Sequence, residues 1–578
     1  MGFSGSDAGG FQWDGFSSGA PSQSRPPKEK KPRKGVSSPV ARVFINLGVT
    51  LIFGLVFFYA ELPALNLHAP EFYTFAFLIC AVYCICAIIT SGFQGDGFKG
   101  YFKFLKKQCI VPLVLVVLLF VTAIVGNIAG SVFFRASAYS ELLPFEVGTF
   151  SDDVDEIPFD QIPMLDKDSA IRLGDRKLGE LSDMVSQFEV MEDYTQINYK
   201  GHPVRIASLQ YADLIKWFTN RSDGLPAYLV IDMVTQKVEL HRLPEGEGIR
   251  YTTAEHLGRY LYRHLRFNYP TFMFGEAVME VNEEGTPYWI CPRIEKTIGL
   301  FGGTDVKGAV LVNAITGECQ YYETADVPTW VDNLYNADLI MKQYDYYGMY
   351  HNGFINSIFG QRDVTITTQG YNYLTLGDDV YMYTGVTSVG GDQSNVGFLL
   401  TNQRTKESNY YSCAGATEYS AMASANGELQ NLRYEATFPL LLNVGGEPTY
   451  FMAMKDAAQL VKKYAMVNVQ QYQIVATGDT VAECERKYLD MLERDGILDG
   501  SANLSGTETV DGTVADIRTA VMGGNSIYYI SLIGNDTYYA ISASEQPDVV
   551  ILNAGDQVTV TYEPGETPIL KAMSIAQR

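Results

Sequence analysis

Three long stretches near the start of the chain contain no charged and no histidine side chain. They cover residues 43–60, 72–92 and 109–134. A helix needs about 20 predominantly apolar residues to cross the hydrocarbon core of a bilayer, and each stretch approaches or exceeds that length. An isolated apolar segment in lipid must satisfy its backbone groups internally, which favours a helix. The sequence therefore predicts a block of three transmembrane helices within residues 43–134.

Positive charge on the flanking segments predicts the orientation of these helices. The chain contains RPPKEKKPRK and Arg42 before the first stretch, and four lysines between the second and third. The loop between the first and second has two Glu residues and no Lys or Arg. Lys and Arg in short loops stay on the cytoplasmic side, so we expect a plasma-membrane protein with a cytoplasmic amino terminus and an extracytoplasmic part after Phe134. A cleaved signal peptide fits less well, because two more spans follow.

The two sides of the membrane block differ in charge. Of the 43 Lys and Arg residues, 11 precede Arg135, whereas only 6 of the 66 Asp and Glu residues do. The predicted exterior is therefore strongly acidic. Phosphate binding requires clustered Lys and Arg, so this charge argues against nucleic acid and anionic lipid as partners of the exterior.

The segments that flank the block show little hydrophobic periodicity. Residues 1–42 are rich in Gly, Ser and Pro and are predicted to be a disordered, basic cytoplasmic tail. Residues 135–169 are predicted to be an acidic linker, since their carboxylates lack the spacing and the turn glycine of a calcium loop. The further divisions that we predict are a first α+β region at 170–278, a repeat at 279–360, more repeats at 361–497, a linker at 498–507 and a small β-barrel at 508–578.

Four segments of the exterior resemble one another. Each runs from a short apolar strand through a polar residue into a second strand. They are YLVIDMVTQKVEL from Tyr228, AVLVNAITGECQYY from Ala309, FLLTNQRTKESNYY from Phe398 and YAMVNVQQYQIV from Tyr464. The aligned polar residues are Asp232, Asn313, Asn402 and Asn468.

These polar residues predict turns. An Asx side chain hydrogen-bonds its own backbone and closes a turn, which Thr or Gly completes, so each segment is predicted to be a β-hairpin. The residues to which we assign this structural role are Asp232, Asn313, Thr316, Gly317, Asn402 and Thr405. Each hairpin is preceded by another apolar strand and followed by a helical pattern. Antiparallel hairpins covered by helices predict an α+β fold.

One of these segments suggests a family. The run GTPYWICPRIEKTIGLFGGTDVKGAVLVNAITGECQYY resembles the PepSY domain, in which a helix covers a small antiparallel sheet. The resemblance is strongest over residues 280–325 and weaker in the other copies. It implies no catalytic residue, and it implies a role in restraining or assisting secreted peptidases or in envelope sensing. The whole chain is also similar to large uncharacterised membrane proteins of Gram-positive bacteria.

The last segment has a different pattern. Residues 508–578 contain five short runs of alternating apolar and polar residues, separated by Gly, Asn or Asp, and they resemble a small OB-like barrel. Many such barrels bind nucleic acid. This one offers only Arg518 and Lys571 before the final Arg578, so we predict that it binds none.

A search for catalytic patterns finds none that is specific. His256 and His264 are eight residues apart, whereas two metal ligands on one helix lie three or four apart. There is no GxSxG nucleophile elbow. Asp378 and Asp379 are adjacent on a predicted strand and would point to opposite faces. We therefore predict no catalytic residue, no metal site and no cofactor.

Two further groups of residues are candidates. Cys291 and Cys319 are predicted to lie on neighbouring strands, where a disulfide is feasible if their Cα atoms come within about 7 Å. Two Tyr pairs fall at the same offset in two repeats, where they either contact a ligand or pack across strands. They are Tyr321, Tyr322, Tyr410 and Tyr411.

Taken together, the patterns favour a membrane-anchored, extracytoplasmic, non-catalytic binding or regulatory protein. Its predicted ligand is an envelope protein, a peptide or cell-wall material. The first alternative is a wall-polysaccharide binder, which requires the Tyr pairs to be exposed in a row. The second is an envelope hydrolase, which requires a deep pocket that gathers carboxylates or His from separate repeats.

Overall fold

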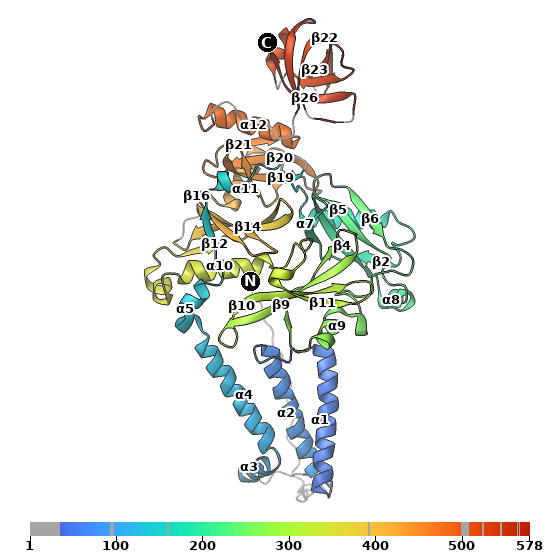
Figure 1. Ribbon diagram of the computed structural model, residues 1–578, viewed down its shortest axis with the longest axis vertical. Coiled ribbons are helices and arrows are strands. Elements are labelled where there is room, and N and C mark those ends of the chain that lie inside the picture. Colours follow the sequence, from blue (N-terminus) through green and yellow to red (C-terminus); the bar gives the residue numbers. More distant parts are fainter. Residues whose placement is uncertain are drawn as a thin grey trace, which may run out of the picture. The chain divides into compact units, whose positions relative to one another are not determined.

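The computed structural model describes most of the chain in two units (Figure 1). The described residues are 35–92, 97–158, 161–390, 394–498, 508–522, 525–543, 546–562, 564–565 and 567–578. The compact units are Met1–Gly54 with Leu78–Leu115, and Leu55–Phe77 with Val116–Arg578. The predicted tail before residue 35 and all but the first residue of the predicted linker at 498–507 lie outside the described residues.

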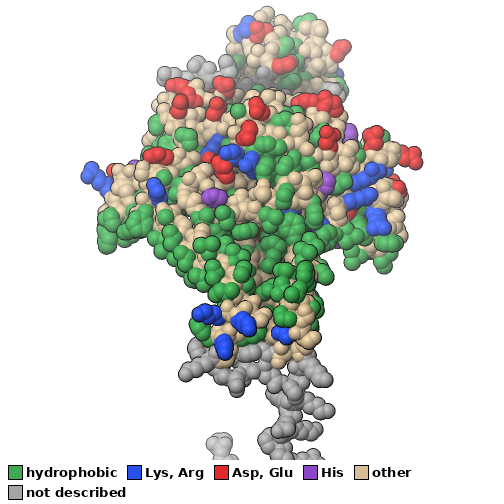
Figure 2. All heavy atoms as spheres, turned by 60° about the horizontal axis from the view of Figure 1, so that its bottom comes forward, with side chains coloured by type: hydrophobic (Ala, Val, Ile, Leu, Met, Phe, Trp, Pro, Cys, Tyr) green, Lys and Arg blue, Asp and Glu red, His purple; other side chains and the backbone are tan. Residues whose placement is uncertain are grey.

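Among the described residues, three helices are long and apolar enough to cross a membrane. They are α1 (Pro39–Glu61), α2 (Pro70–Ser91) and α4 (Ile110–Ala129). Most of their side chains are not buried inside the protein, and Figure 2 shows hydrophobic side chains over this surface. The prediction of three apolar helices is therefore confirmed. A short amphipathic helix, α3 (Gly97–Gln108), with lysines in its last turn, precedes α4.

A β-turn packs against two glycines of the third apolar stretch. Gly126 lies in α4 against the Leu300 side chain, and Gly130 lies against the backbone of Ile298 and Gly299. A side chain at either glycine would overlap this turn or press closely against it. The spacing of these glycines suggests a helix–helix contact, whereas here it admits the turn between two strands of the second repeat.

Within the described residues, four sheets share one plan. A helix comes first and two short strands follow, which pair end to end with one long strand. Two more antiparallel strands follow, and the third sheet has one parallel strand in addition. The first sheet follows α7 (Lys167–Gly179) and contains β2 (Phe188–Val190), β3 (Thr195–Tyr199), β4 (His202–Tyr211), β5 (Ala227–Asp232) and β6 (Val238–Arg242). Helix α8 (Leu214–Asn220) lies between β4 and β5 of this first sheet. The second sheet follows α9 (Leu261–Asn268) and contains β7 (Met273–Phe274), β8 (Val278–Val281), β9 (Pro287–Ile298), β10 (Gly302–Asn313) and β11 (Cys319–Glu323).

The third and fourth sheets repeat this order. The third follows α10 (Ala337–Tyr350) and contains β12 (Thr365–Thr367), β13 (Asn372–Leu376), β14 (Asp379–Ser388), β15 (Ser394–Asn402) and β16 (Ser408–Ala416). The fourth follows α11 (Glu418–Glu428) and contains β17 (Glu435–Ala436), β18 (Leu440–Val444), β19 (Glu447–Lys455), β20 (Val461–Asn468) and β21 (Val475–Gly478). Helix α12 (Val481–Arg494) follows the last strand. Alternating helices and antiparallel sheets make this a mixed α+β protein.

The segment predicted to be an acidic linker is packed into the repeats. It contains the end of α5 (Val132–Ser140), β1 (Glu146–Gly148) and α6 (Phe150–Asp153). Strand β1 pairs in parallel with β16, and Phe150 packs in the core that the third and fourth sheets share. The buried side chains of residues 150–165 are spaced among the acidic ones, which is why composition alone suggested a solvated segment.

The carboxy-terminal strands close into a barrel. They are β22 (Glu508–Met522), β23 (Asn525–Leu532), β24 (Tyr538–Ser542), β25 (Gln557–Tyr562) and β26 (Ile569–Gln577). The order around the barrel is β22-β23-β24-β26-β25, with β22 long enough to pair with both β23 and β25. The predicted five-stranded barrel is confirmed. Its interior is filled by side chains such as Val514, Ile530, Tyr539 and Val560.

Candidate functional site

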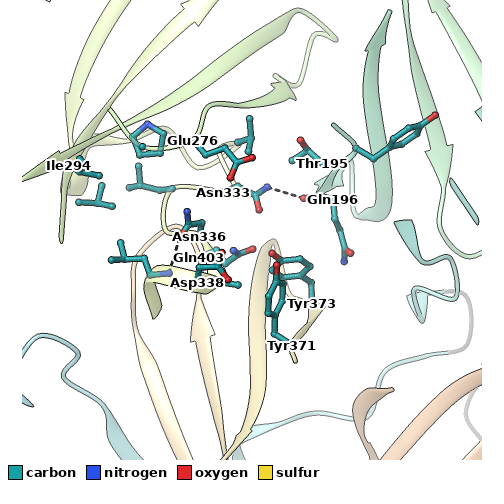
Figure 3. A pocket seen from close by; sticks show the side chains of 18 of the residues that line it. Thr195, Gln196, Glu276, Ile294, Asn333, Asn336, Asp338, Tyr371, Tyr373 and Gln403 are labelled. Atoms are coloured by element: carbon teal, nitrogen blue, oxygen red, sulfur yellow. Dashed lines mark hydrogen bonds between the residues drawn. The ribbon is translucent and has the colours of Figure 1, made fainter. Parts of the chain in front are cut away.

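A cavity of about 350 Å³ lies where the first three repeats meet (Figure 3). Its volume falls within the range of small-ligand pockets, about 300–1,000 Å³. We call it the junction cavity. Its walls come from β3 and β4, from the second sheet around β8 to β10, and from the start of α10 with β13. Its lining residues include Thr195, Gln196, Arg205, Glu276, Val278, Ile294, Val306, Asn333, Asp338, Tyr371, Tyr373 and Gln403.

One short connector, residues 331–335, ties the three repeats together at this cavity. The buried Glu280 carboxylate of β8 accepts hydrogen bonds from the backbone N–H groups of Asp332 and Asn333, both at 2.8 Å. The Asn333 side chain donates to the Gln196 carbonyl oxygen of β3 at 2.9 Å, as the dashed line in Figure 3 shows. The carbonyl oxygen of Gln403 in the third repeat accepts from the next two backbone N–H groups. The cavity wall is therefore held from three sides.

Two acidic side chains are buried behind this connector. Asp332 accepts from the Asn198 N–H at 2.6 Å and lies close enough to Glu280 for their charges to interact. Burial raises the pKa of Glu280 to about 7, against the lowering effect of its N–H donors. Burial and the Glu280 carboxyl hold the pKa of Asp332 well above its usual range. Because two buried carboxylates repel each other, the pair retains a proton more readily than exposed acids do.

Arg205 forms the floor of the junction cavity. It is 7% exposed, and its guanidinium donates to the Leu165 carbonyl oxygen at 3.3 Å and to the Gln196 side-chain oxygen at 3.5 Å. No carboxylate of the described residues forms an ion pair with it, since the nearby Asp166 pairs with Lys455 instead. Burial lowers the pKa of Arg205, against the raising effects of Tyr373 and Asp166. A buried cation without an ion-pair partner is costly, and it marks this end of the cavity.

The polarity of the cavity changes from floor to rim. Gln196 beside Arg205 is 4% exposed, and its side-chain nitrogen has no hydrogen-bond partner in the described part of the chain. At the rim, Glu276 and Asp338 are exposed and both act electrostatically on Tyr371. Burial strongly raises the pKa of Tyr373, which lies beside Tyr371 in Figure 3 and interacts electrostatically with Arg205. The cavity thus presents a cation inside and carboxylates outside.

The lining of the junction cavity does not contain a Ser–His or Cys–His pair among the described residues. Its described lining contains no His, Ser or Cys side chain. Asp379, one of the acids considered above, pairs with Arg404 through two contacts of 2.7 and 2.8 Å. His264 bonds the Gly317 carbonyl oxygen at 2.7 Å, while His256 packs edge-on against Trp217. No group of three His, Cys, Asp or Glu suited to a metal ion is found among the described residues.

The residues predicted to close the hairpin turns lie in the turns of four corresponding hairpins. In each, one Asx side-chain oxygen accepts from the N–H groups two and three residues later, at 2.7 to 3.0 Å. Thr316 and Thr405 hydroxyls accept one further N–H each. Gly317 adopts φ of 79°, which favours glycine. Together with Asp232, Asn313, Asn402 and Asn468, these residues shape the repeats, and none lines the junction cavity.

The four tyrosines predicted as ligand contacts lie on two different sheets and pack inward. Tyr321 and Tyr322 of β11 are half-buried, as is Tyr410 of β16, and Tyr411 is 1% exposed. Tyr410 stacks on Tyr344 with ring centroids 6.3 Å apart. The four rings do not form the exposed row that a polysaccharide surface requires. Their role as ligand contacts stays a prediction.

Cys291 and Cys319 are both free thiols. Cys291 pairs with Val310 and Cys319 with Val312, so the whole of β10 lies between their strands. Strands are spaced about 4.8 Å apart, so two spacings exceed the reach of a disulfide. The expectation that they lie on neighbouring strands was wrong, because the repeat is a meander whose first and third long strands do not touch.

Arg205 and the Glu280–Asp332 pair were not singled out from the sequence. The available signal was a single charge inside an apolar strand, in the run HPVRIASL. Nothing local shows that three repeats converge on it. A comparison of the chain with models of known protein families and with curated proteins finds no match.

Proposed function

We propose that this protein is a membrane-anchored, extracytoplasmic, non-catalytic binding protein that takes up its ligand in the junction cavity. The observation that carries this proposal is a cavity lined by three repeats, with the buried Arg205, which forms no ion pair within the described residues, in its lining. A buried charge and an unpartnered amide are expensive to keep for folding alone, which favours a binding role. Binding at a junction would also suit a regulatory role, since it bears on three repeats at once.

We also propose a family for the repeats and a fold for the carboxy-terminal barrel. The helix-then-sheet plan of the repeats supports their assignment as PepSY-like domains. The barrel order, with its first strand paired at both ends, supports an OB-like barrel. In this barrel Arg518 pairs with Asp516 and Arg578 with Asp511, which supports a role without nucleic acid.

Exposed apolar side chains beside the outer ends of the spans support the membrane assignment. On one flank, Ile215 and Phe218 of α8 are 74% and 65% exposed, near α9, whose Phe267 packs edge-on against Phe58 of α1. On another, Phe359 is 82% exposed, in a segment whose Phe354 packs against Phe133 after α4. Such surfaces suit the interface of a bilayer. We propose that they rest on the outer leaflet.

A retention experiment with a filled cavity tests the binding role. Gly275 lines the junction cavity, and a Cβ there would meet only ordinary contacts, so Gly275→Leu places a side chain in it. Gly427→Leu in α11 adds the same bulk where nothing lies within 4 Å. We expect full-length protein in nanodiscs to retain envelope protein or peptide, the Gly427 variant to do the same, and the Gly275 variant to lose it. Equal retention by all three proteins would contradict binding in the cavity.

The hydrolase remains a second candidate because of one observation. Glu276 and Asp338 come from different repeats and share one rim. Two carboxylates flanking a substrate are what acid-catalysed hydrolysis requires. Release of soluble fragments from isolated peptidoglycan by the native protein, lost in Glu276→Gln/Asp338→Asn, would favour this function over simple binding. The packed Tyr pairs give no comparable support to a polysaccharide surface.

A further inference from the structure

The floor of the junction cavity belongs to a group of charges that does not balance. Arg205 and Lys455 are 7% and 4% exposed, and both lie near Asp166, which forms an ion pair with Lys455. Two buried cations therefore share one carboxylate. The excess positive charge lies on Arg205, the member of the group that lines the cavity. This excess stands out in a chain whose net charge is −23.

The donors at the floor match one kind of anion. A guanidinium presents parallel N–H groups that fit the two oxygens of a carboxylate. In Arg205, Nε and Nη2 each donate one N–H group to the protein, so the pair of donors left for a ligand is on Nη1 and the second N–H of Nη2. The Gln196 side chain lies beside this guanidinium, and its oxygen accepts from the guanidinium at 3.5 Å, which helps to orient Arg205. A phosphate group would be served less well, because no lysine and no second arginine lines the cavity within the described residues.

The rest of the cavity restricts the ligand further. Val278, Ile294 and Val306 supply an apolar part of the lining, and Figure 3 shows Ile294 on the side away from Gln196. The exposed rim carries Glu276 and Asp338, two carboxylates that repel an anion and attract a cation. The amino-terminal end of α10 also reaches the rim, but Asn336 caps it and Asp338 in the first turn offsets its dipole.

We infer that the junction cavity binds a zwitterionic ligand of the amino-acid or short-peptide class, with its carboxylate on Arg205, an apolar side chain against the apolar part of the lining and its ammonium group at the rim. This inference rests on the proposed binding function and names its ligand class. It also assigns the two rim carboxylates a recognition role. No bond is formed or broken in this binding.

Four matched probes separate the two charged ends. Glycyl-leucine has both charges, N-acetyl-glycyl-leucine lacks the ammonium group, glycyl-leucinamide lacks the carboxylate, and N-acetyl-glycyl-leucinamide lacks both. We expect calorimetry with the full-length protein in nanodiscs to rank glycyl-leucine first and the acetylated acid second. The two amides should bind at least tenfold more weakly than the corresponding acids.

Variants assign each charge to its partner. Arg205→Met should reduce affinity for both acids at least tenfold, because it removes the guanidinium and keeps an apolar stem. Gln196→Leu, which leaves the charge in place, should reduce it less. Glu276→Gln/Asp338→Asn alters only exposed side chains, and it should weaken glycyl-leucine several-fold while leaving the acetylated acid unchanged.

Several outcomes would overturn the inference. These are amides that bind as tightly as acids, an Arg205→Met protein that folds and keeps its affinity, or no measurable binding of any probe. If Arg205→Met fails to fold, the Gln196 and rim variants still test whether the cavity recognises the two charged ends of the ligand. The retention experiment with Gly275→Leu is independent of ligand charge. Cavity-dependent retention without probe binding would therefore refute the ligand class and leave the binding function standing.

Discussion

At the scale of single residues, two glycines explain why the Tyr pairs recur. The Tyr321 hydroxyl donates to the Lys307 carbonyl oxygen at 3.4 Å, and the Tyr410 hydroxyl donates to that of Val396 at 3.3 Å. In each case the next residue is a glycine, Gly308 or Gly397, over which the ring lies. The repeated Tyr therefore covers a glycine on the neighbouring strand, which is a packing function.

We expect Gly308→Ala and Gly397→Ala to destabilise the protein. A Cβ at Gly308 would overlap the Tyr322 carbonyl oxygen, and one at Gly397 would overlap that of Tyr411 and the Tyr410 ring. Backbone cannot move aside easily, so the expected loss is about 1–3 kcal/mol in each repeat. Thermal unfolding of the full-length protein measures it. Gly427→Ala, where nothing lies within 4 Å, is the matched control and should be neutral or slightly stabilising.

The buried acid pair predicts a pH dependence. The pKa of Glu280 is raised to about 7 in the folded state, so the folded protein binds more protons than the unfolded chain between the ordinary pKa of a glutamate and about pH 7. The contribution to stability is present at acidic pH and is lost as pH rises through about 7, in the same direction as that of Asp332. It amounts to a few kcal/mol at most, from about 1.4 kcal/mol per pKa unit.

Unfolding midpoints between pH 5 and pH 8 check this dependence. The native protein should lose stability across the range, and Glu280→Gln, which carries no titrating carboxyl, should show a flatter profile. Glu407 lies outside this acid pair, and Glu407→Gln should leave the profile of the native protein intact. Parallel profiles for the native and Glu280→Gln proteins would refute the assignment.

At the scale of elements, the role of the Asx residue in the hairpin turns can be tested with a substitution that another repeat already contains. Asn313 accepts from the N–H groups of Ile315 and Thr316, and the first repeat has Asp232 in the same place. Asn313→Ala should lower the free energy of unfolding by about 1–2 kcal/mol, because two N–H groups lose their acceptor. Asn313→Asp should be tolerated. Chemical denaturation compares the three proteins, and equal losses in both variants would show that the side-chain oxygen is not what matters.

Local sequence patterns predicted the helices and strands better than they predicted which strands and repeats contact one another. The apolar stretches, the four hairpins and the five barrel strands follow from periodicity and turn residues that lie within a few positions of one another. The junction cavity does not, because it depends on Gln196, Glu280 and Asn333 meeting across long separations in sequence. The prediction that Cys291 and Cys319 lie on neighbouring strands was wrong for the same reason, because the order of strands is a property of the whole sheet.

At the scale of the whole molecule, the flanking apolar surfaces predict contact with lipid. Replacing the 82% exposed Phe359 by Trp should give fluorescence that is quenched by brominated lipid in nanodiscs. Tyr472→Trp, at a 51% exposed position of the fourth repeat, should not be quenched. Subtracting the emission of the native protein isolates each new side chain. Equal quenching at both positions, or none at Phe359→Trp, would contradict contact of this flank with the bilayer.

The hairpin of β9 and β10 reaches from the junction cavity to the third apolar helix. Thr304 and Val306 of β10 line the junction cavity, while the turn at residues 299–300 lies on Gly126 and Gly130 of the third apolar stretch. The two strands are paired along nearly their whole length, with one register shift between Val306 and Gly308. The junction cavity and the third apolar helix are therefore connected by one two-stranded hairpin.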